Sequence, residues 1–554
     1  MESELIYGPD RLPWRETVSE MAVTKDGELL VSPPSADPLQ LPSYPCVASR
    51  AGADDHLYQL TSSGHAPEQR DKALKEILAH LSKENALLLS AQGDPHFSVD
   101  TIREYMSNGR LFLGGGDPYV NGPCDHSMKW MERSLLDLLA SLWHAKWPHH
   151  PSDLDSYWGH LMSIDTTEGA YYCLRNARDY LSGKFIDEAF DISLDTGKQD
   201  PRGVDVYSQG KYDTQTPNAY KPVVFFTSEA HRSFSKAAHT VNMPTFHTLG
   251  TARYPDQCPL GSVWPHFVPC EGGDAGPGTV DIEALAKLVD FFSGKGHPVV
   301  VVLNYGSHFK GACDDVKRAG EVLVPILKKN GMYERSLHIK NDTLVTRRGF
   351  WFHVDGFLAA LYMPFLEMAY RKGLTPQKPG PVFDFRLEFV TSLAANFHTW
   401  GGSPWPAAVF MTRSSHQLRK TKDFFGFFDT VLTGARNVYS IILLWTQFAT
   451  TDFTQEAKRV AEYLTAAGNI EKELEKLEVE IGVNLWVKRE PYSFAIRFLK
   501  PCKEIVEKYH LATRSLEIEG QLRDYAQICR MDEERANALL EDLRHSSAFS
   551  LIVT

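Results

Sequence analysis

Hydrophobic and polar residues follow two alternating patterns through the middle of the chain, from about residue 155 to residue 415. Short apolar runs of strand type occur at 157–164, 222–227, 297–304 and 351–355. They are separated by segments with apolar residues at helical spacing, at 168–181, 231–241 and 282–293. Buried strands that alternate with amphipathic helices are typical of a mainly parallel sheet covered by helices. This part of the chain is therefore predicted to have an α/β fold.

The pattern differs on both sides of this region. The N-terminal 70 residues are rich in Pro, Ser and Asp without clear periodicity, which predicts an irregular arm. Helical spacing appears at 69–83, at 126–143, in a charged segment at 456–482 and at 531–544, with a strand-like segment at 493–501. We predict three parts: an irregular and helical N-terminal segment at 1–125, a large domain at 126–415 and a small α+β domain at 416–554.

The composition limits the class of protein. The chain has 554 residues, of which 43% are hydrophobic and 23% charged, as in globular proteins of more than one domain. The net charge of −12 argues against a general nucleic-acid binder, because no basic surplus neutralises phosphates. The longest apolar run, 438–445, is too short to span a membrane, and the start has no secretory signal pattern. Eight cysteines without CxxC spacing suit reduced thiols and no metal site, which predicts a cytoplasmic protein.

Candidate chemistry is concentrated where strands are predicted to end. Asp355 closes the run Trp-Phe-His-Val-Asp, and open α/β sheets place ligand-binding groups at the carboxyl ends of buried parallel strands. His398 and Thr399 form a polar pair that opens into a glycine turn. Thr166 and Thr167 lie between a predicted strand and a predicted helix, where hydroxyls and backbone N–H groups can bind an anion. An ordinary helix N-cap formed by either threonine is the alternative.

Several motifs carry a resemblance to a known family. The segment Phe-His-Val-Asp-Gly at 352–356 is similar to that family's His-Val-Asp-Ala, and 396–404 is similar to its Ser/Asn-x-His-Lys-Trp/Phe-x-Gly-x-Pro loop. The block at 227–238 matches Ser-x-x-Ala-His-x-Ser-x-x-Lys-Ala-Ala, and 303–315 resembles a segment that ends in Gly-Ala-x-Asp-Asp. Over roughly residues 85 to 520, the chain resembles the group II pyridoxal-phosphate-dependent amino-acid decarboxylases.

This resemblance implies a fold-type I large domain that binds pyridoxal 5'-phosphate, an amino-acid substrate, and a homodimer with its active site at the subunit interface. The implied reaction is that of a carboxy-lyase, in which the electron-poor ring accepts the carbanion left by lost CO₂. The implied cofactor-binding residues are Thr166 and Thr167 at the phosphate, His231 on the ring face, Ser307 near the cofactor, Asp355 at the pyridine nitrogen, and Asn396 and His398 beside the phosphate. The implied catalytic positions are His231, His308 and Thr399.

The chain departs from the family at the cofactor lysine, whose position is taken by Thr399. Threonine cannot form a Schiff base. Lys236 and Lys310 stand where relatives also carry lysine, so neither is identified as a relocated nucleophile. In addition, His308 replaces a threonine close to the cofactor.

A second departure follows Asp355, where Gly356 and bulky Phe357 could reshape the floor under the ring. Three functions stay open at this point. The first is decarboxylation without a Schiff-base lysine, and the second is another lysine-independent reaction in which His308 or His398 carries the proton. The third is a non-catalytic role in dimerisation or binding.

Overall fold

The computed structural model describes residues 22–23, 29–30, 66–89, 103, 113–119, 128–162, 164–186, 207–339, 342–403, 406–418, 435–529, 531–545 and 547–549. The chain divides into two compact units, residues 1–87 and 88–554. The first unit contains the antiparallel pair β1 (Ala22–Val23) and β2 (Leu29–Leu30) and the helix α3 (Pro67–Leu87). The helix predicted at 69–83 is thereby confirmed, whereas most of the predicted irregular arm lies outside the described residues.

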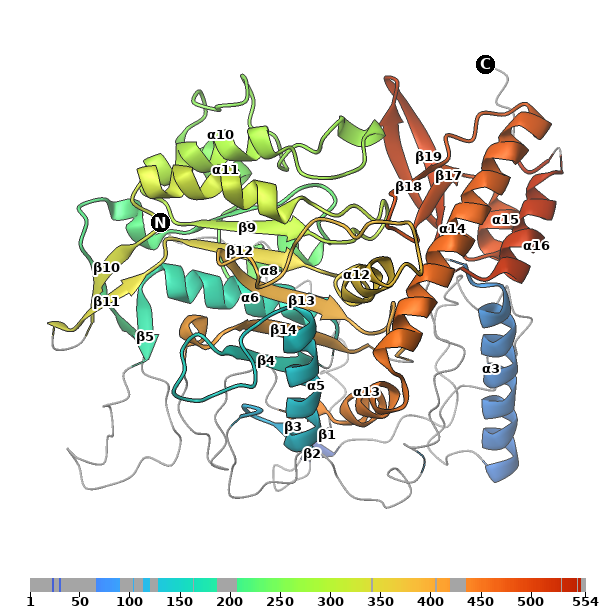
Figure 1. Cartoon of the computed structure of the whole chain (residues 1–554), viewed down its shortest axis with the longest axis horizontal. Helices are drawn as coiled ribbons and strands as arrows, with labels where there is room; N and C mark the ends of the chain where they lie inside the picture. The colour runs from blue at the N-terminus through green and yellow to red at the C-terminus, as the bar shows by residue number, and fades with distance from the viewer. Residues whose placement is uncertain are drawn as a thin grey trace. The chain divides into compact units, whose positions relative to one another are not determined.

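A mixed sheet of six strands forms the centre of the second unit, as far as the described residues show (Figure 1). Its order is β4 (Tyr157–Met162), β14 (Ala408–Arg413), β13 (Val390–Asn396), β12 (Phe350–Asp355), β9 (Val299–Asn304) and β8 (Val223–Phe225). β8, β9, β12 and β13 pair in parallel, and β14 runs antiparallel between β13 and β4. The predicted α/β fold with a mainly parallel sheet is confirmed.

Helices bury the faces of this sheet, which explains its uninterrupted apolar strands. They are α6 (Thr166–Leu181), α8 (Ser233–Thr240), α9 (Phe246–Arg253), α10 (Ile282–Gly294), α11 (Val316–Lys329) and α12 (Met363–Arg371). α6 packs on β12, β13 and β14, and Trp351, Phe410, Tyr172 and Phe234 lie in the same core cluster. α11 and α12 were not predicted, and in α11 the internal Pro325 weakens the helical signal.

The helix α5 (Lys129–Leu142) confirms the helical segment predicted at 126–143. It packs on β4 and on α13 (Tyr439–Thr450), and its Leu135, Leu136 and Leu139 are fully buried. Beside it, β3 (Leu113–Gly115) pairs with β15 (Ala435–Asn437), and Arg436 of β15 forms a buried ion pair with Glu132. The described residues of the same chain thus cover the face of α5 formed by these leucines.

The C-terminal part contains α14 (Phe453–Ile481), α15 (Lys503–Lys508) and α16 (Glu533–Leu543). Its antiparallel sheet has the order β16 (Lys488–Arg489), β17 (Ile496–Leu499), β19 (Gln521–Ile528) and β18 (Ala512–Ile518). The helix predicted at 531–544 is confirmed by α16, which Asp532 caps by accepting a hydrogen bond from the N–H of Arg535. The hairpin of β18 and β19 was not predicted, although the Glu519–Gly520 turn has the two positive φ angles typical of tight hairpins.

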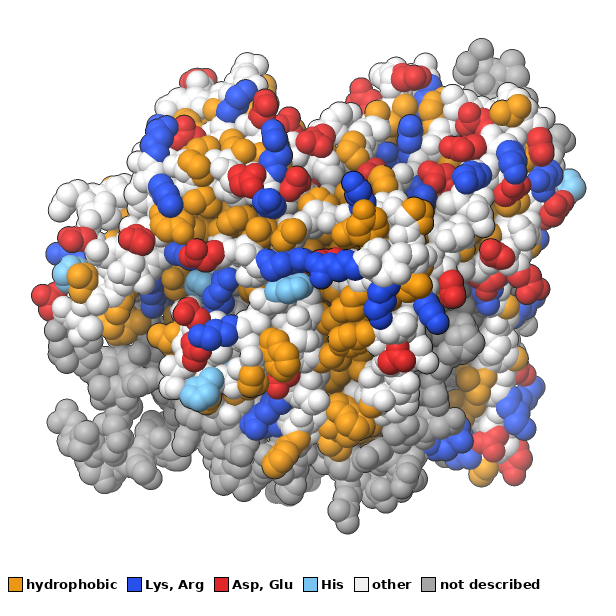
Figure 2. All heavy atoms as spheres, in the orientation of Figure 1, with side chains coloured by type: hydrophobic (Ala, Val, Ile, Leu, Met, Phe, Trp, Pro, Cys, Tyr) orange, Lys and Arg blue, Asp and Glu red, His pale blue; other side chains and the backbone are white. Residues whose placement is uncertain are grey.

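Smaller elements complete the described fold. β11 (Leu344–Arg347), β10 (Arg335–His338) and β7 (Lys211–Tyr212) form one sheet, and β5 (Lys184–Ile186) pairs with β6 (Tyr207–Gln209). Short 3₁₀ helices are η3 (Pro217–Tyr220), η4 (Gly273–Ala275) and η6 (Ser414–His416). Within the described ranges, no helix has the length and apolar character needed to cross a bilayer. Figure 2 shows acidic and basic side chains interspersed on one face of the molecule. The predicted boundary near residue 416 stays a prediction.

Candidate active site

The candidate residues lie at the carboxyl ends of the parallel strands, where the sequence placed them. β4, β8, β9, β12 and β13 end next to one another at a single edge of the sheet. The residues that follow or close these strands are Thr166 and Thr167, His231, Ser307 and His308, Asp355, and Asn396, His398 and Thr399. The fold therefore brings together segments that are more than 200 residues apart in the sequence.

Asp355 is the last residue of β12 and is only 5% exposed. Its Oδ1 atom is buried without a hydrogen-bond partner. Burial raises the pKa of this carboxyl to about 7, and the nearby negative charge of Asp165 contributes to the rise. A protonated ring nitrogen placed against Oδ1 would supply both the missing donor and the missing positive charge.

Thr399 lies inside the site and not on the surface, since only 8% of it is exposed. Its hydroxyl donates to Oδ1 of Asn396 at 2.8 Å and lies 3.4 Å from the carbonyl oxygen of Phe357. Oδ1 of Asn396 thus has a hydrogen-bond partner, whereas the amide Nδ2 of the same residue is buried and has none. Nδ1 of His398 is likewise buried without a partner, and burial lowers the pKa of that imidazole. Two nitrogen atoms at the end of β13 are thus open to a ligand.

The amino end of α6 offers an anion seat, by which we mean the backbone N–H groups of Thr166 and Thr167. Thr166 is buried, and Thr167 is partly exposed. Neither threonine is the N-cap, which corrects the alternative considered from the sequence. The cap is Asp165, whose Oδ1 accepts the N–H of Thr167 at 2.5 Å. A carboxylate of the chain itself therefore occupies part of the seat, and Ser163 just before it lies outside the described residues.

Four rings lie next to one another across the site, and three of them are stacked. His231 and His308 lie 4.6 Å apart at 24°, and His308 and Phe357 lie 3.4 Å apart at 25°. His398 meets Phe357 edge-on at 5.9 Å. His231 and Phe357 make no ring contact with each other, so His308 lies between them. Burial, together with the neighbouring His231 and His398, lowers the pKa of His308 to about 3, which keeps this imidazole neutral.

This stack changes the role expected for His308. The sequence assigned His231 to one face of a cofactor ring and Phe357 to the floor below it. The structure places the imidazole of His308 in the space between these two side chains. A flat ring can enter the same space only after His308 turns away.

The structure explains why glycine follows Asp355. A Cβ atom on Gly356 would lie 2.3 Å from the Cβ of Ala360, closer than two carbon atoms can approach. Gly356 donates its N–H to the carbonyl of Ala394, which fixes the turn after β12. The departure from alanine is thus a packing requirement at this turn.

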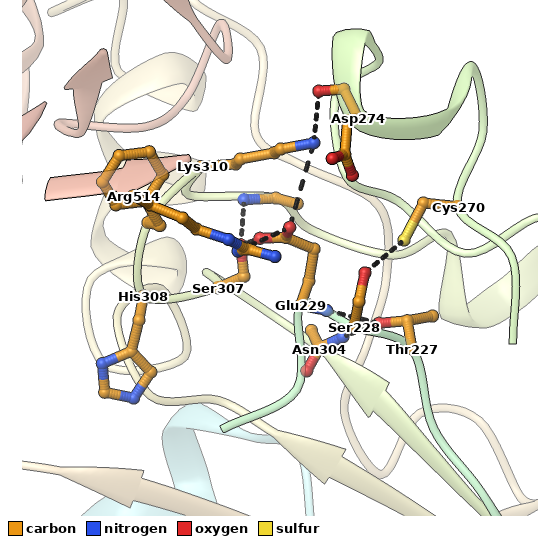
Figure 3. Close-up of polar contacts among 12 residues, drawn as sticks. Thr227, Ser228, Glu229, Cys270, Asp274, Asn304, Ser307, His308, Lys310 and Arg514 are labelled. Carbon is orange, nitrogen blue, oxygen red and sulfur yellow. Dashed lines mark hydrogen bonds and ion pairs between the residues drawn. The ribbon is translucent and has the colours of Figure 1, made fainter. Parts of the chain in front are cut away.

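Glu229 organises a buried polar cluster behind the stack (Figure 3). Its Oε1 accepts a hydrogen bond from Nη1 of Arg514 at 2.8 Å, and its Oε2 accepts one from the hydroxyl of Ser307 at 3.3 Å. Lys310 lies 3.8 Å from Oε1 and donates to the carbonyl of Asp274 at 2.8 Å. Figure 3 shows His308 pointing away from this cluster. Ser307, expected near the cofactor, thus supports the loop that carries His308.

The C-terminal sheet also holds this loop. Gln527 on β19 donates through Nε2 to the carbonyls of His308 at 2.8 Å and Phe309 at 3.1 Å. Sequence reasoning missed Gln527 and Arg514, because the hairpin that carries them was not predicted. It also left Glu229 without a role, although this residue lies inside the 227–238 block.

Two lysines were considered as replacements for the missing amine. Lys310 is hydrogen-bonded within the protein, and Lys236 is exposed. Lys310 is 3% exposed, and its Nζ donates to the carbonyls of Asp274 and Gly276. Lys236 lies on the exposed side of α8. Neither position identifies a relocated nucleophile.

The buried polar atoms without partners test whether these residues suit pyridoxal phosphate. Asp355 offers an acceptor for a ring N–H, while Asn396 and His398 offer nitrogen atoms at the end of the next strand. This set of groups fits a flat, protonated ring that carries an anion. The fit requires that His308 leave the stack and that the anion compete with Asp165 at the seat.

Comparison with known proteins gives extensive matches, of which three are described. L-methionine decarboxylase from Streptomyces sp. 590 is 34% identical to this chain and has a TM-score of 0.80. The match covers 89% of this chain and 97% of that protein. The histidine decarboxylase of Solanum lycopersicum is 22% identical over 391 residues, which is 70% of this chain and 68% of that protein. Serine decarboxylase 3 of Oryza sativa subsp. japonica is 26% identical over 253 residues, 45% of this chain and 48% of that protein. No protein-family model matches the chain.

The fold and the relatives agree with the motifs. The sheet order places the aspartate, histidine and asparagine motifs at one edge, and the match to the Streptomyces enzyme spans nearly all of both proteins. The chain therefore belongs to the group II pyridoxal-phosphate-dependent amino-acid decarboxylases.

Proposed function

We propose that this chain binds pyridoxal 5'-phosphate without a covalent bond and acts on an amino acid as an atypical carboxy-lyase. The observation that carries this proposal is the buried carboxylate of Asp355, which has a partnerless oxygen at the end of β12. A structural aspartate in a core is normally hydrogen-bonded, because an unpaired buried charge costs several kcal/mol. An oxygen left open at a strand end is better explained by a ligand.

Each residue of the candidate site has a separate role in this proposal. Pyridoxal phosphate, when bound, supplies an electron sink for the carbanion left by lost CO₂. Asp355 would keep a proton on the ring nitrogen, because a buried carboxylate stabilises an adjacent positive charge. Asn396 and His398, each with an unpartnered nitrogen atom, would hold the phosphate side. Thr399 hydrogen-bonds to Asn396 and offers no amine, so nothing at this position ties the cofactor to the chain.

We infer that the substrate has an apolar side chain. The L-methionine decarboxylase from Streptomyces sp. 590 matches over nearly its full length. Phe357 and the neutral imidazoles of His308 and His398 surround the space next to Asp355, and they provide no charge to pair with a charged substrate side chain. An unbranched thioether or aliphatic side chain suits such surroundings.

One observation favours a second function. His308 fills the space between His231 and Phe357, which a cofactor ring would need. A chain in which this stack never opens would be a non-catalytic member of the family, kept as a binding or dimerisation partner.

Binding of the cofactor separates the two functions. We expect the purified chain to bind pyridoxal phosphate reversibly, with an absorbance change lost on dialysis, and to retain no cofactor after borohydride reduction. Asp355→Asn should weaken this binding by about tenfold or more, since a charge-assisted hydrogen bond contributes about 1.5–3 kcal/mol. Asp256→Asn, at an exposed position, is the matched control.

Thr399→Lys completes the test. If the remaining site is intact, this variant should retain the cofactor covalently after reduction, as shown by peptide mass spectrometry. A reduced adduct on Lys236 or Lys310 in the natural chain would contradict non-covalent binding. If neither the natural chain nor Thr399→Lys binds the cofactor, the non-catalytic function is correct.

We further propose a cytoplasmic homodimer. The six cysteines in the described ranges carry free thiols, which suits a reducing compartment. Trp130 on α5 is 75% exposed, and Ile164 next to the anion seat is 53% exposed. Large apolar side chains exposed beside a site favour a covering partner.

A further inference from the structure

A second group of charged residues lies at the opposite edge of the central sheet. β12 begins at Phe350, directly after Arg347, Arg348 and Gly349, and β14 ends at Arg413. These termini surround a cavity of about 610 Å³. Because β12 has six residues, roughly 20 Å of strand separates this cavity from Asp355. The cavity is therefore distinct from the candidate active site.

Two arginines in the cavity wall have no acidic partner. Nη1 of Arg347 donates to the carbonyls of Tyr180 and Lys184, and Nη1 of Arg413 donates to those of Glu388 and Val390. In the part of the chain that the structure describes, neither forms an ion pair with a carboxylate. Burial lowers the pKa of both guanidinium groups, yet arginine stays charged in proteins. Backbone carbonyls thus fix two cations that form no ion pair with a carboxylate of the described residues, although the charges of Glu388 and Asp155 act on Arg413.

Three acidic residues line this cavity in the described part of the chain, and all three are exposed. Arg348 donates to Oε1 of Glu388 at 2.7 Å, but the side chain of Glu388 is 76% exposed. Asp155 and Glu334, which also line the cavity, are exposed as well. A ligand that carries negative charge would meet the arginines in the wall and the acids at the mouth.

His416 supplies an independent indication of a ligand. It lines the cavity, is 5% exposed, and has a buried Nδ1 atom without a partner. Its imidazole is neutral, because burial and the three nearby arginines lower its pKa to about 3. A neutral imidazole can donate one N–H to an anion. The hydroxyl of the exposed Ser415 and the ring of Tyr180, which lies 4.9 Å below the Arg347 guanidinium, add polar and aromatic contacts.

We propose that this arginine cavity, lined by Tyr180, Arg347, Arg348, Arg413, Ser415 and His416, binds a small organic dianion. Two guanidinium forks match the geometry of phosphate and carboxylate groups. The volume suits a metabolite and is too small for a macromolecule. The ligand is thus a phosphate monoester or a dicarboxylate, and it binds independently of the cofactor at the other end of β12.

Titration calorimetry on the full chain tests this site. The probes are inorganic phosphate and succinate, each measured with and without saturating pyridoxal phosphate. We expect saturable binding of at least one probe that is unchanged by the cofactor. Preference for phosphate identifies a phosphate ester as the ligand, and preference for succinate identifies a dicarboxylate. Phosphate bound at the anion seat of α6 would instead be displaced by the cofactor, so the two sites are distinguishable.

Substitutions in the arginine cavity test whether the probes bind there. Arg413→Met should weaken it by about tenfold or more, whereas Arg371→Met, at a mostly exposed position on α12, should not. Ser415→Glu adds a negative charge at an exposed wall position without removing a contact of the fold, and it should also abolish binding. This second variant keeps the test decisive if Arg413→Met does not fold. The proposal is overturned if neither probe binds saturably up to about 10 mM, or if the natural chain, Arg413→Met and Ser415→Glu bind equally.

Discussion

The side chain of His308 stands where a cofactor ring has to enter, between His231 and Phe357. Ring stacking of this kind contributes about 0.5–1.5 kcal/mol beyond the buried area. His308→Thr removes the ring and restores the threonine that the family carries. We therefore expect this variant to bind pyridoxal phosphate up to about tenfold more tightly in an absorbance titration.

His239→Thr is the control for this prediction, because it removes an exposed histidine from the same region. Unchanged or weaker cofactor binding in His308→Thr would show that His308 does not block the site.

Asp355 makes the stability of the cofactor-free chain depend on pH. Its pKa is raised to about 7, so between about pH 4 and pH 7 the folded chain holds a proton that the unfolded chain releases. The free energy of unfolding therefore falls as the pH rises through this range. Asp355→Asn has no charge to bury, and we expect it to be more stable than the natural chain by a few kcal/mol above about pH 7 but not below about pH 4.

Urea unfolding at several pH values measures this difference, with Asp256→Asn as the exposed control. Saturating pyridoxal phosphate should abolish the advantage of Asp355→Asn, since a protonated ring nitrogen compensates the carboxylate. A pH-independent difference between the two chains would contradict the argument.

Sequence reasoning succeeded for residues whose position follows from the ends of strands. Asp355 could be placed because ligand-binding groups lie at the carboxyl ends of parallel strands, whereas Asn396 and His398 were assigned through the resemblance to the family motif. The capping role of Asp165 and the position of His308 could not be predicted, since both depend on side-chain conformations across loops. Asp165 occupies part of the anion seat, and His308 occupies the space expected for the cofactor ring.

At the scale of elements, strong periodicity gave the correct type of structure. The buried runs at 297–304 and 351–355 became β9 and β12, and the charged segment after residue 455 became α14. The β18–β19 hairpin was missed because only some of the inward positions of its strands are buried, which leaves a weak alternation. The hydrogen bonds from this hairpin to the His308 loop could therefore not be predicted from the sequence.

The contribution of this hairpin to the stability of the His308 loop can be tested with Gln527→Met. This variant keeps the size of the side chain and removes both donated hydrogen bonds to the carbonyls of His308 and Phe309. Each lost bond costs about 1 kcal/mol, so amide hydrogen exchange in residues 305–313 should accelerate by about fivefold or more. Mass spectrometry of the exchanged peptides measures this effect.

Gln521→Met, at an exposed position on the same strand, should leave exchange in the loop unchanged. Equal exchange in both variants and the natural chain would show that the C-terminal sheet does not hold the loop.

For the whole molecule, we expect a dimer in sedimentation at micromolar concentration. Trp130→Glu should shift the chain toward monomer, because it places a charge in an exposed apolar position. Leu522→Glu, at an equally exposed apolar position on β19, should not. A natural chain that sediments as a monomer and still binds the cofactor would refute the dimer.

The cap on α6 has a consequence for ligand selection. Asp165 acts as a tethered competitor for the anion seat, present at an effective concentration that the fold sets and that dilution cannot reduce. Any incoming anion binds only in the fraction of molecules whose cap has turned away, and its apparent affinity is reduced by that fraction. A free anion has no second contact with which to offset this reduction. A molecule that reaches both the seat and Asp355 does, so the seat disfavours simple anions relative to ligands that join an anion to a protonated ring.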